Sequence, residues 1–217
     1  MKVVNLGATN SVLNTFMAEL RDKQFQQNRT LFRRNLTRIG QVLAYELSKT
    51  LSYSDTVVET PLAEKTVCTY DDHIVVGTVL RAGLAFHEGF LGVFDRADNA
   101  FVAAYREEGS ADNLKIHVDY MVSPDLGGAT LLLVDPMLAS GGSMELAYQA
   151  LLRAGKPRKL HLCVAIAAPE GVQHLKEVFP NDDVTLWTAA IDDRLNEQAY
   201  IVPGLGDAGD LSFGEKL

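Results

Sequence analysis

The fold can be inferred from one stretch near the middle of the chain, Leu131-Leu-Leu-Val-Asp-Pro-Met-Leu-Ala-Ser-Gly-Gly-Ser143. Its first four residues are apolar, as expected of a central parallel strand that is buried on both faces. The small residues 139–143 leave backbone N–H groups accessible, and residues 144–154 have helical spacing that ends at Gly155. Because a helix N-terminus binds anions, the stretch predicts a phosphate site with Asp135, a sugar-binding carboxylate, beside it.

A simpler interpretation of Gly141-Gly-Ser143 is a turn between a strand and a helix with no ligand, since such turns are common. No Lys follows the glycines, so the loop is not of the Walker A type. The longer string from Asp135 to Ser143 is more specific, and in it the sequence resembles the phosphoribosyltransferases, within them the uracil-specific family. Ser140 stands where family members usually carry Thr, a change that keeps the hydroxyl group.

Other segments strengthen the resemblance, and together they cover nearly the whole chain. Val79–Leu84 resembles the family's pyrophosphate loop, Ala104–Glu108 its second basic element, and Ala168–Gly171 a string that follows the next strand. The end of the chain is the most particular, because Ile191–Glu197 and Tyr200–Asp210 resemble the uracil-binding segment.

The resemblance implies an α/β fold, the type I phosphoribosyltransferase fold, in which helices flank a mostly parallel sheet. We expect residues 1–217 to form a single domain with an N-terminal helical arm, a β-hairpin projecting from about residues 107–128, and a C-terminal base-binding segment. The implied reaction transfers 5-phosphoribose from 5-phosphoribosyl-1-diphosphate to uracil and gives UMP and diphosphate, as in pyrimidine salvage. The implied cofactor is Mg²⁺, bound mainly through the diphosphate and not ligated directly by the protein.

The resemblance also assigns the residues of the site. Asp135, Arg81 and Arg106 are the expected catalytic residues, and a cis peptide bond is expected next to Arg81. The sequence offers no general base for N1 of uracil. The expected donor-binding residues are Arg81, Arg106, Asp135, Pro136, Met137, Leu138, Ala139, Ser140, Gly141, Gly142, Ser143 and Asp207, and the expected uracil-binding residues are Ile201, Gly206, Asp207 and Ala208.

The two arginines and the C-terminal segment also have interpretations that involve no ligand. Arg81 could be a surface arginine after a strand, and Arg106 part of a solvated charge run. Gly204–Gly209 matches the dinucleotide pattern G-x-G-x-x-G, but that pattern needs a helix and a second strand after it, and only residues 210–217 follow. Composition alone suggests a frayed tail here. We interpret the glycines as letting the backbone approach a flat base.

Composition narrows the class of protein. A chain of 217 residues with 47% hydrophobic content suits one α/β domain. The net charge of −8 argues against a nucleic-acid-binding protein, and it means that an anionic substrate needs local arginines, helix-terminal N–H groups and Mg²⁺. Cys68 and Cys163 lie in apolar stretches and are expected in the core. With no apolar run long enough for a membrane span and no leader pattern, we expect a cytoplasmic protein with no membrane partner.

The N-terminal region has two apolar stripes at helical spacing, within residues 12–20 and 32–47. An arm of this kind has little core of its own to cover, so we expect the stripes to pack partly on a second subunit of a homodimer or larger homo-oligomer. A GTP effector is a further expectation from the family. The acidic pairs at 71–72, 182–183 and 192–193 are interpreted as turns and surface, with Asp192 or Asp193 as candidates for shaping the base pocket.

Two functions of other classes compete with the uracil enzyme. One is a non-catalytic RNA-binding pyrimidine regulator on the same fold, which the acidic net charge and the intact C-terminal string oppose. The other is a phosphoribosyltransferase for a purine or for orotate, which the C-terminal string also opposes.

Overall fold

The computed structural model describes residues 1–106, 116–180 and 183–215, with backbone only at 104–106 and 116–119. A central sheet has the strand order β1-β10-β9-β7-β4-β5-β6, and the short β8 pairs with β9. All neighbours in this sheet are parallel except β5 and β6. Its strands are β1 (Lys2–Asn5), β4 (Ile74–Leu80), β5 (Asp98–Arg106), β6 (Ile116–Val122), β7 (Thr130–Val134), β8 (Met137–Leu138), β9 (Lys159–Ala167) and β10 (Val184–Ile191).

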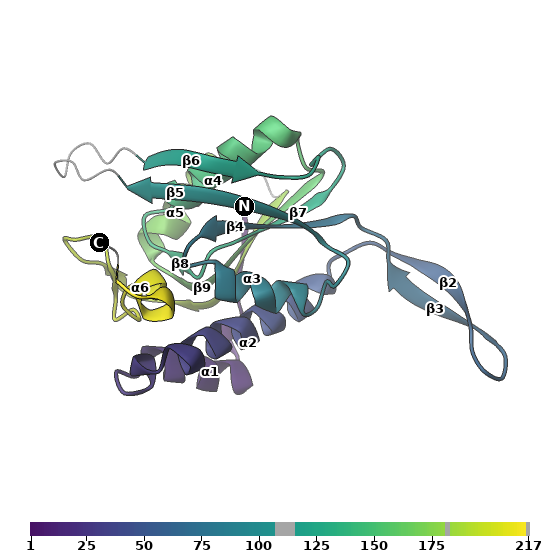
Figure 1. Cartoon of the computed structure of the whole chain (residues 1–217), viewed down its shortest axis with the longest axis horizontal. Helices are drawn as coiled ribbons and strands as arrows, with labels where there is room; N and C mark the ends of the chain where they lie inside the picture. Colours follow the sequence, from purple (N-terminus) through teal and green to yellow (C-terminus); the bar gives the residue numbers. More distant parts are fainter. Residues whose placement is uncertain (107–115, 181–182, 216–217) are drawn as a thin grey trace.

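Helices cover both faces of this sheet, as Figure 1 shows. One face packs against α1 (Val12–Arg21), α2 (Arg29–Ser48) and α3 (Leu84–Leu91), and the other against α4 (Gly142–Leu151) and α5 (Pro169–Val178). The prediction of a mostly parallel sheet flanked by helices is confirmed. The remaining helices are α6 (Ala208–Phe213) and the 3₁₀ turns Leu6–Ala8, Phe25–Gln27 and Leu152–Ala154.

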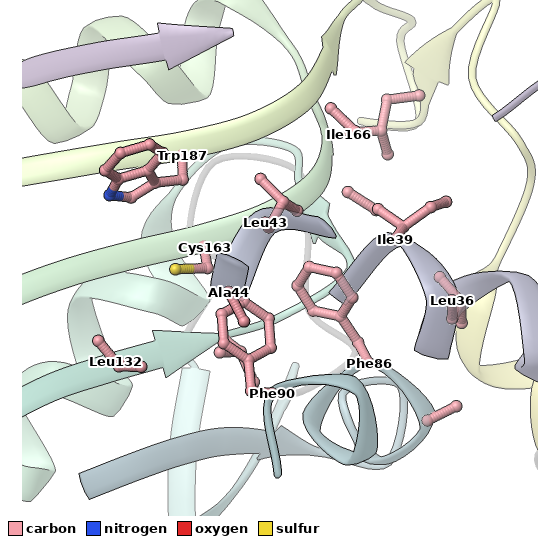
Figure 2. Packing of buried hydrophobic residues seen from close by; sticks show 14 of the residues in the cluster. Leu36, Ile39, Leu43, Ala44, Phe86, Phe90, Leu132, Cys163, Ile166 and Trp187 are labelled. Carbon is pink, nitrogen blue, oxygen red and sulfur yellow. The ribbon is translucent and has the colours of Figure 1, made fainter. Parts of the chain in front are cut away.

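The larger core lies between the sheet and the N-terminal helices. Leu36, Ile39 and Leu43 of α2 are fully buried, and Figure 2 shows them in one apolar cluster with Phe86 of α3 and Trp187 of β10. The apolar stripe of α2 therefore packs on the sheet and on α3 of its own chain. Our reason for placing these stripes on a second subunit was wrong, because the N-terminal helices have a large intrachain core to cover.

Two β elements differ from the sequence-based expectation. Residues 2–5 form a strand, β1, that joins the edge of the sheet parallel to β10 and that we did not predict from the sequence. Strands β2 (Tyr53–Glu59) and β3 (Glu64–Tyr70) form a separate antiparallel ribbon that projects from the body of the protein (Figure 1). Of the hairpin expected at 107–128, the described part contains β6, which pairs antiparallel with β5; residues 107–115 lie outside the described residues, so the projecting hairpin stays a prediction.

Two single-residue expectations are also corrected, and one alternative suggested by composition is excluded. Cys68 is exposed, because the ribbon that carries it has no layer packed over it, whereas Cys163 is buried as expected. Asp72 is buried rather than superficial, since it accepts hydrogen bonds from Ser52 N–H and the Thr130 hydroxyl and pairs with Arg158. The C-terminal stretch is not a frayed tail: β11 (Arg194–Leu195) pairs with β12 (Ile201–Val202), and α6 follows.

Among the described residues, no helix combines the length and the hydropathy that crossing a bilayer requires.

Candidate active site

The predicted phosphate loop lies between the end of β7 and the start of α4. Gly141 is the N-cap of α4 with φ of +93°, a conformation that glycine adopts without strain. A Cβ atom at this position would lie 2.8 Å from His174 Cδ2 on α5. The loop therefore needs glycine both for its backbone conformation and for its packing, and it ends in a helix N-terminus as an anion site requires.

Strand β9 and helix α5 contact this loop and fix its position. Ala168 N–H donates to the Leu138 carbonyl at 2.8 Å, so β8 fixes the middle of the loop against the end of β9. On α5, Gly171 lies so close that a Cβ there would be 2.2 Å from the Ala139 carbonyl oxygen. His174 Nε2 is 2.8 Å from Glu145 Oε2, which ties α5 to the first turn of α4. The loop is thus positioned by regular structure on both sides.

Asp135 follows β7 directly and lies at the carboxyl edge of the sheet. Its Oδ1 accepts a 3.4 Å hydrogen bond from Met137 N–H. The pKa of Asp135 is raised to about 7. Burial is the largest cause, the negative charge of Asp207 also raises the pKa, and the hydrogen bond from Met137 N–H lowers it. Asp207 belongs to the C-terminal segment, so the structure brings two of the predicted site residues from distant parts of the sequence close enough to interact electrostatically.

The stability of the ligand-free protein should depend on this carboxyl group. Since the pKa of Asp135 is higher in the folded protein than in the unfolded chain, raising the pH between the two values ionises only the unfolded state and lowers stability. Relative to Asp135→Asn, the wild type is expected to lose up to ~1.4 kcal/mol per pH unit as the pH rises from 5 to 7. Urea unfolding of both proteins across this range measures the difference, and parallel pH profiles would contradict the raised pKa.

Arg81 begins the loop after β4, and the Leu80–Arg81 peptide bond is cis, as expected. Its Nη2 donates to Asp210 Oδ1 at 3.1 Å and to the Gly214 carbonyl at 3.3 Å. Arg81 is therefore not an isolated surface arginine, because it reaches the C-terminal segment. The predicted diphosphate residue and the predicted base-binding segment share one region of the molecule.

Arg106 is the last residue of β5, and its backbone pairs with Ile116 of β6. Its side chain lies outside the described residues, so its assignment to the diphosphate stays a prediction.

The C-terminal segment forms a compact turn structure. Gly204 and Gly206 have φ of +66° and +88°, in the left-handed region that glycine adopts without strain. Asp207 is the N-cap of α6, and its side chain accepts a hydrogen bond from Asp210 N–H at 2.9 Å. Ile201 and Ala208, the other predicted base-contacting residues besides Gly206 and Asp207, are buried.

Sequence reasoning missed the contacts that hold this turn. Asp192 is buried and accepts hydrogen bonds from both Nη atoms of Arg21 and from Gly204 N–H. Burial raises the pKa of Asp192, but the Arg21 guanidinium and the Gly204 N–H outweigh burial and hold the pKa below its usual value. The resemblance of Ile191–Glu197 to the uracil-binding segment had made Asp192 a candidate for shaping the base pocket. Nothing in the sequence around Arg21 indicated a partner 171 residues away.

The acidic residues of the site suit a magnesium ion that arrives with its substrate. Mg²⁺ prefers oxygen ligands and is commonly held by one or two carboxylates together with substrate phosphates and water. Asp135 and Asp207 provide two interacting carboxylates beside the phosphate loop. In the described part of the chain, no group of three or more His, Cys, Asp or Glu side chains forms a self-sufficient metal site.

Comparison with known proteins agrees with this arrangement. The family model described as "Uracil phosphoribosyltransferase" matches residues 8–215. A protein of that name from Porphyromonas gingivalis is 50% identical over 217 residues and covers 100% of both chains. Another, from Thermococcus gammatolerans, is 37% identical over 207 residues, which are 93% of this chain and 88% of the relative.

Solved structures also resemble this fold. A protein from Aquifex aeolicus matches with a TM-score of 0.87 and 33% identity over 98% of each chain. A purine phosphoribosyltransferase from Pyrococcus horikoshii matches with a TM-score of 0.50 and 13% identity over 74% of this chain and 84% of that one, a likeness that shows the shared fold alone. The match of residues 8–215 to the family model and the full-length match to the relative from Porphyromonas gingivalis are decisive: the chain belongs to the uracil phosphoribosyltransferase family.

Proposed function

We propose that this protein transfers 5-phosphoribose from 5-phosphoribosyl-1-diphosphate to uracil, giving UMP and diphosphate. The observation that carries the proposal is the convergence of three sequence segments at one edge of the sheet. The loop after β7, the loop after β4 and the C-terminal segment interact through Asp135, Asp207, Arg81 and Asp210. Ligands of parallel α/β proteins bind at the carboxyl ends of the strands, which is where these loops lie.

The reaction breaks the bond between C1 of ribose and the diphosphate oxygen, and positive charge develops on the ribose ring. The protein's task is to stabilise the departing diphosphate and to hold N1 of uracil opposite it, so no protein nucleophile is needed. In the proposed roles, Asp135 holds the ribose hydroxyls, residues 139–143 bind the 5-phosphate through backbone N–H groups, and Arg81 and Arg106 bind the diphosphate. Mg²⁺, bound mainly through the diphosphate, would neutralise charge on it, and the nearby carboxylates of Asp135 and Asp207 would favour the cation without ligating it directly.

We further propose that the enzyme works in the cytoplasm as a homodimer or larger homo-oligomer, and that GTP acts as an effector. Sedimentation analysis tests the oligomer, and initial rates with and without added GTP test the effector. A strictly monomeric enzyme whose rates do not respond to GTP would remove both parts without affecting the assigned reaction.

Base selectivity is the prediction that tests the proposed function. If backbone groups of residues 200–210 accept from N3–H and donate to O4 of uracil, cytosine presents the reverse pattern at both positions. Each unpaired buried group costs ~1–3 kcal/mol, so kcat/KM for cytosine should be at least about 10²-fold lower than for uracil. A diphosphate-release assay with a panel of nucleobases measures this ratio.

The same assay separates the competing functions. A preference for hypoxanthine or orotate would show that the C-terminal segment is misassigned while the phosphoribosyl site is right. The absence of turnover with every base would favour the RNA-binding regulator. The net charge of −8 speaks against that regulator, because binding to RNA phosphates requires a concentration of basic side chains.

A further inference from the structure

An ion pair between the end of α1 and the segment after β10 holds the turn that precedes the predicted base-binding residues 206–208. Arg21, the last residue of α1, donates from Nη1 and Nη2 to the two carboxylate oxygens of Asp192, at 2.7 and 2.6 Å. The Asp192 side chain is only 5% exposed. Charge-assisted bidentate pairs of this kind are among the strongest and most directional contacts that side chains make.

Both members of the ion pair also form a hydrogen bond with the backbone of Gly204. Gly204 N–H donates to Asp192 Oδ2 at 2.7 Å, and the Gly204 carbonyl accepts from Arg21 Nη1 at 3.0 Å. The next carbonyl, that of Leu205, accepts from Gln26 Nε2 at 2.7 Å. The N-terminal segment thus fixes the orientation of two consecutive peptide groups in the C-terminal segment.

The turn at Gly204 has little freedom to adopt another position. Gly204 has φ of +66°, and a Cβ atom there would lie 2.0 Å from the Ile201 carbonyl oxygen. Two residues later the chain reaches Gly206, the first of the predicted base-contacting residues after the turn. A rotation of the Gly204 peptide would therefore displace residues 206–208 directly, and a displacement of about 1 Å at a reacting centre can cost about 10²-fold in rate.

We propose that Arg21, Asp192 and Gln26 are positioning residues that hold the base-reading segment in register with the phosphoribosyl site. They set the affinity for uracil and the discrimination against cytosine without touching the base. This inference rests on the proposed function. The ion pair leaves no net charge behind the site, so its contribution is geometric: it presents the backbone groups of residues 206–208 at fixed positions.

The principal test is Arg21→Ala with chemical rescue. Losing hydrogen bonds between charged partners typically costs ~1.5–3 kcal/mol, so KM for uracil should rise about tenfold to hundredfold, while KM for 5-phosphoribosyl-1-diphosphate changes by less than about threefold. Added guanidinium ion at millimolar concentration should restore KM for uracil. The Arg21 side chain is 27% exposed, so an ion from solvent can reach the space that the substitution leaves.

The matched control is Arg158→Ala. Arg158 also pairs with a buried carboxylate, that of Asp72, but it lies beside the start of β9, at the opposite edge of the sheet from the site. This variant should lower the melting temperature, leave KM for uracil unchanged, and show no response to guanidinium. Equal increases of both KM values in Arg21→Ala, or no rescue of its KM for uracil, would overturn the positioning role.

A milder variant keeps the test decisive if Arg21→Ala fails to fold. Gln26→Ala removes only the contacts to the Leu20 and Leu205 carbonyls and leaves the ion pair intact. It should raise KM for uracil by about three- to tenfold at nearly unchanged kcat. The ratio of kcat/KM for uracil to kcat/KM for cytosine should therefore fall. An unchanged KM and an unchanged ratio in Gln26→Ala would sink the inference. A wild-type protein that makes no UMP would sink the proposed function instead.

Discussion

Replacing Gly141 by Val is expected to lower kcat/KM by about 10³-fold or more, because removing even one preorganised N–H donor costs 10²–10³-fold in comparable sites. Gly141 has φ of +93° and contacts His174 so closely that any Cβ must displace the loop or α5. A β-branched residue in this conformation forces the loop to rearrange, and the N–H groups of residues 139–143 then lose their common direction. Steady-state kinetics with uracil and 5-phosphoribosyl-1-diphosphate measure the loss.

Gly128→Val is the matched control for this substitution. Gly128 also has positive φ, +78°, but no atom lies within 4 Å of the Cβ that a substitution would add. It lies in the turn before β7, at the opposite end of that strand from the phosphate loop. This variant should lose stability through backbone strain and keep its kcat/KM. Comparable activity losses in both variants would mean that strain, not the anion site, causes the effect at Gly141.

Arg81→Ala is expected to lower kcat by about 10²-fold or more if the guanidinium contacts the diphosphate mainly in the transition state. A contact that is equally strong in the ground state would raise KM for the donor and spare kcat. In the ligand-free structure Arg81 pairs with Asp210, with the two side chains 40% and 32% exposed. Partly exposed pairs contribute about 0–1 kcal/mol, so the diphosphate can displace Asp210 at little cost.

Asp210→Asn distinguishes the two ways in which Arg81 could act. If Arg81 matters through the diphosphate, this variant keeps its kcat within about threefold, because the pair that it weakens is worth little. If Arg81 merely anchors α6, both variants should lose activity equally. Unchanged kcat and KM in Arg81→Ala would return this residue to the surface role that its sequence context also allowed.

Local patterns were sufficient for the parts of the fold that depend on local contacts. The buried strand Leu131–Val134, the glycines at 141 and 142 and the helix after them follow from residue spacing and small side chains. The range 169–178 begins with a proline suited to a helix start, and α5 occupies that range. Resemblance to a family added the assignment of Arg81 and of the C-terminal segment to one active site, which periodicity alone could not supply.

The missed features depend on contacts between residues far apart in sequence. β1 is short and partly exposed, and it becomes a strand because the edge of β10 offers it backbone partners. Cys68 lies in an apolar run that looks like core, yet no other layer packs on its ribbon. Asp72 and Asp192 appear as ordinary acidic pairs in the sequence, and only the arginines from other segments explain their burial. Pattern reasoning has no access to such partners.

The position of β1 has a consequence for how the chain folds during its synthesis. Lys2 pairs with Thr185, and Arg21 with Asp192, so the first two dozen residues acquire these partners only after most of the protein has left the ribosome. Contacts at such sequence separation form slowly, because the long intervening loop must close first. Strands β4, β7 and β9 can assemble while the N-terminal segment waits. The edge of the sheet at β1 and the Arg21–Asp192 pair beside the turn at Gly204 therefore cannot form until residues 185–192 have been synthesised.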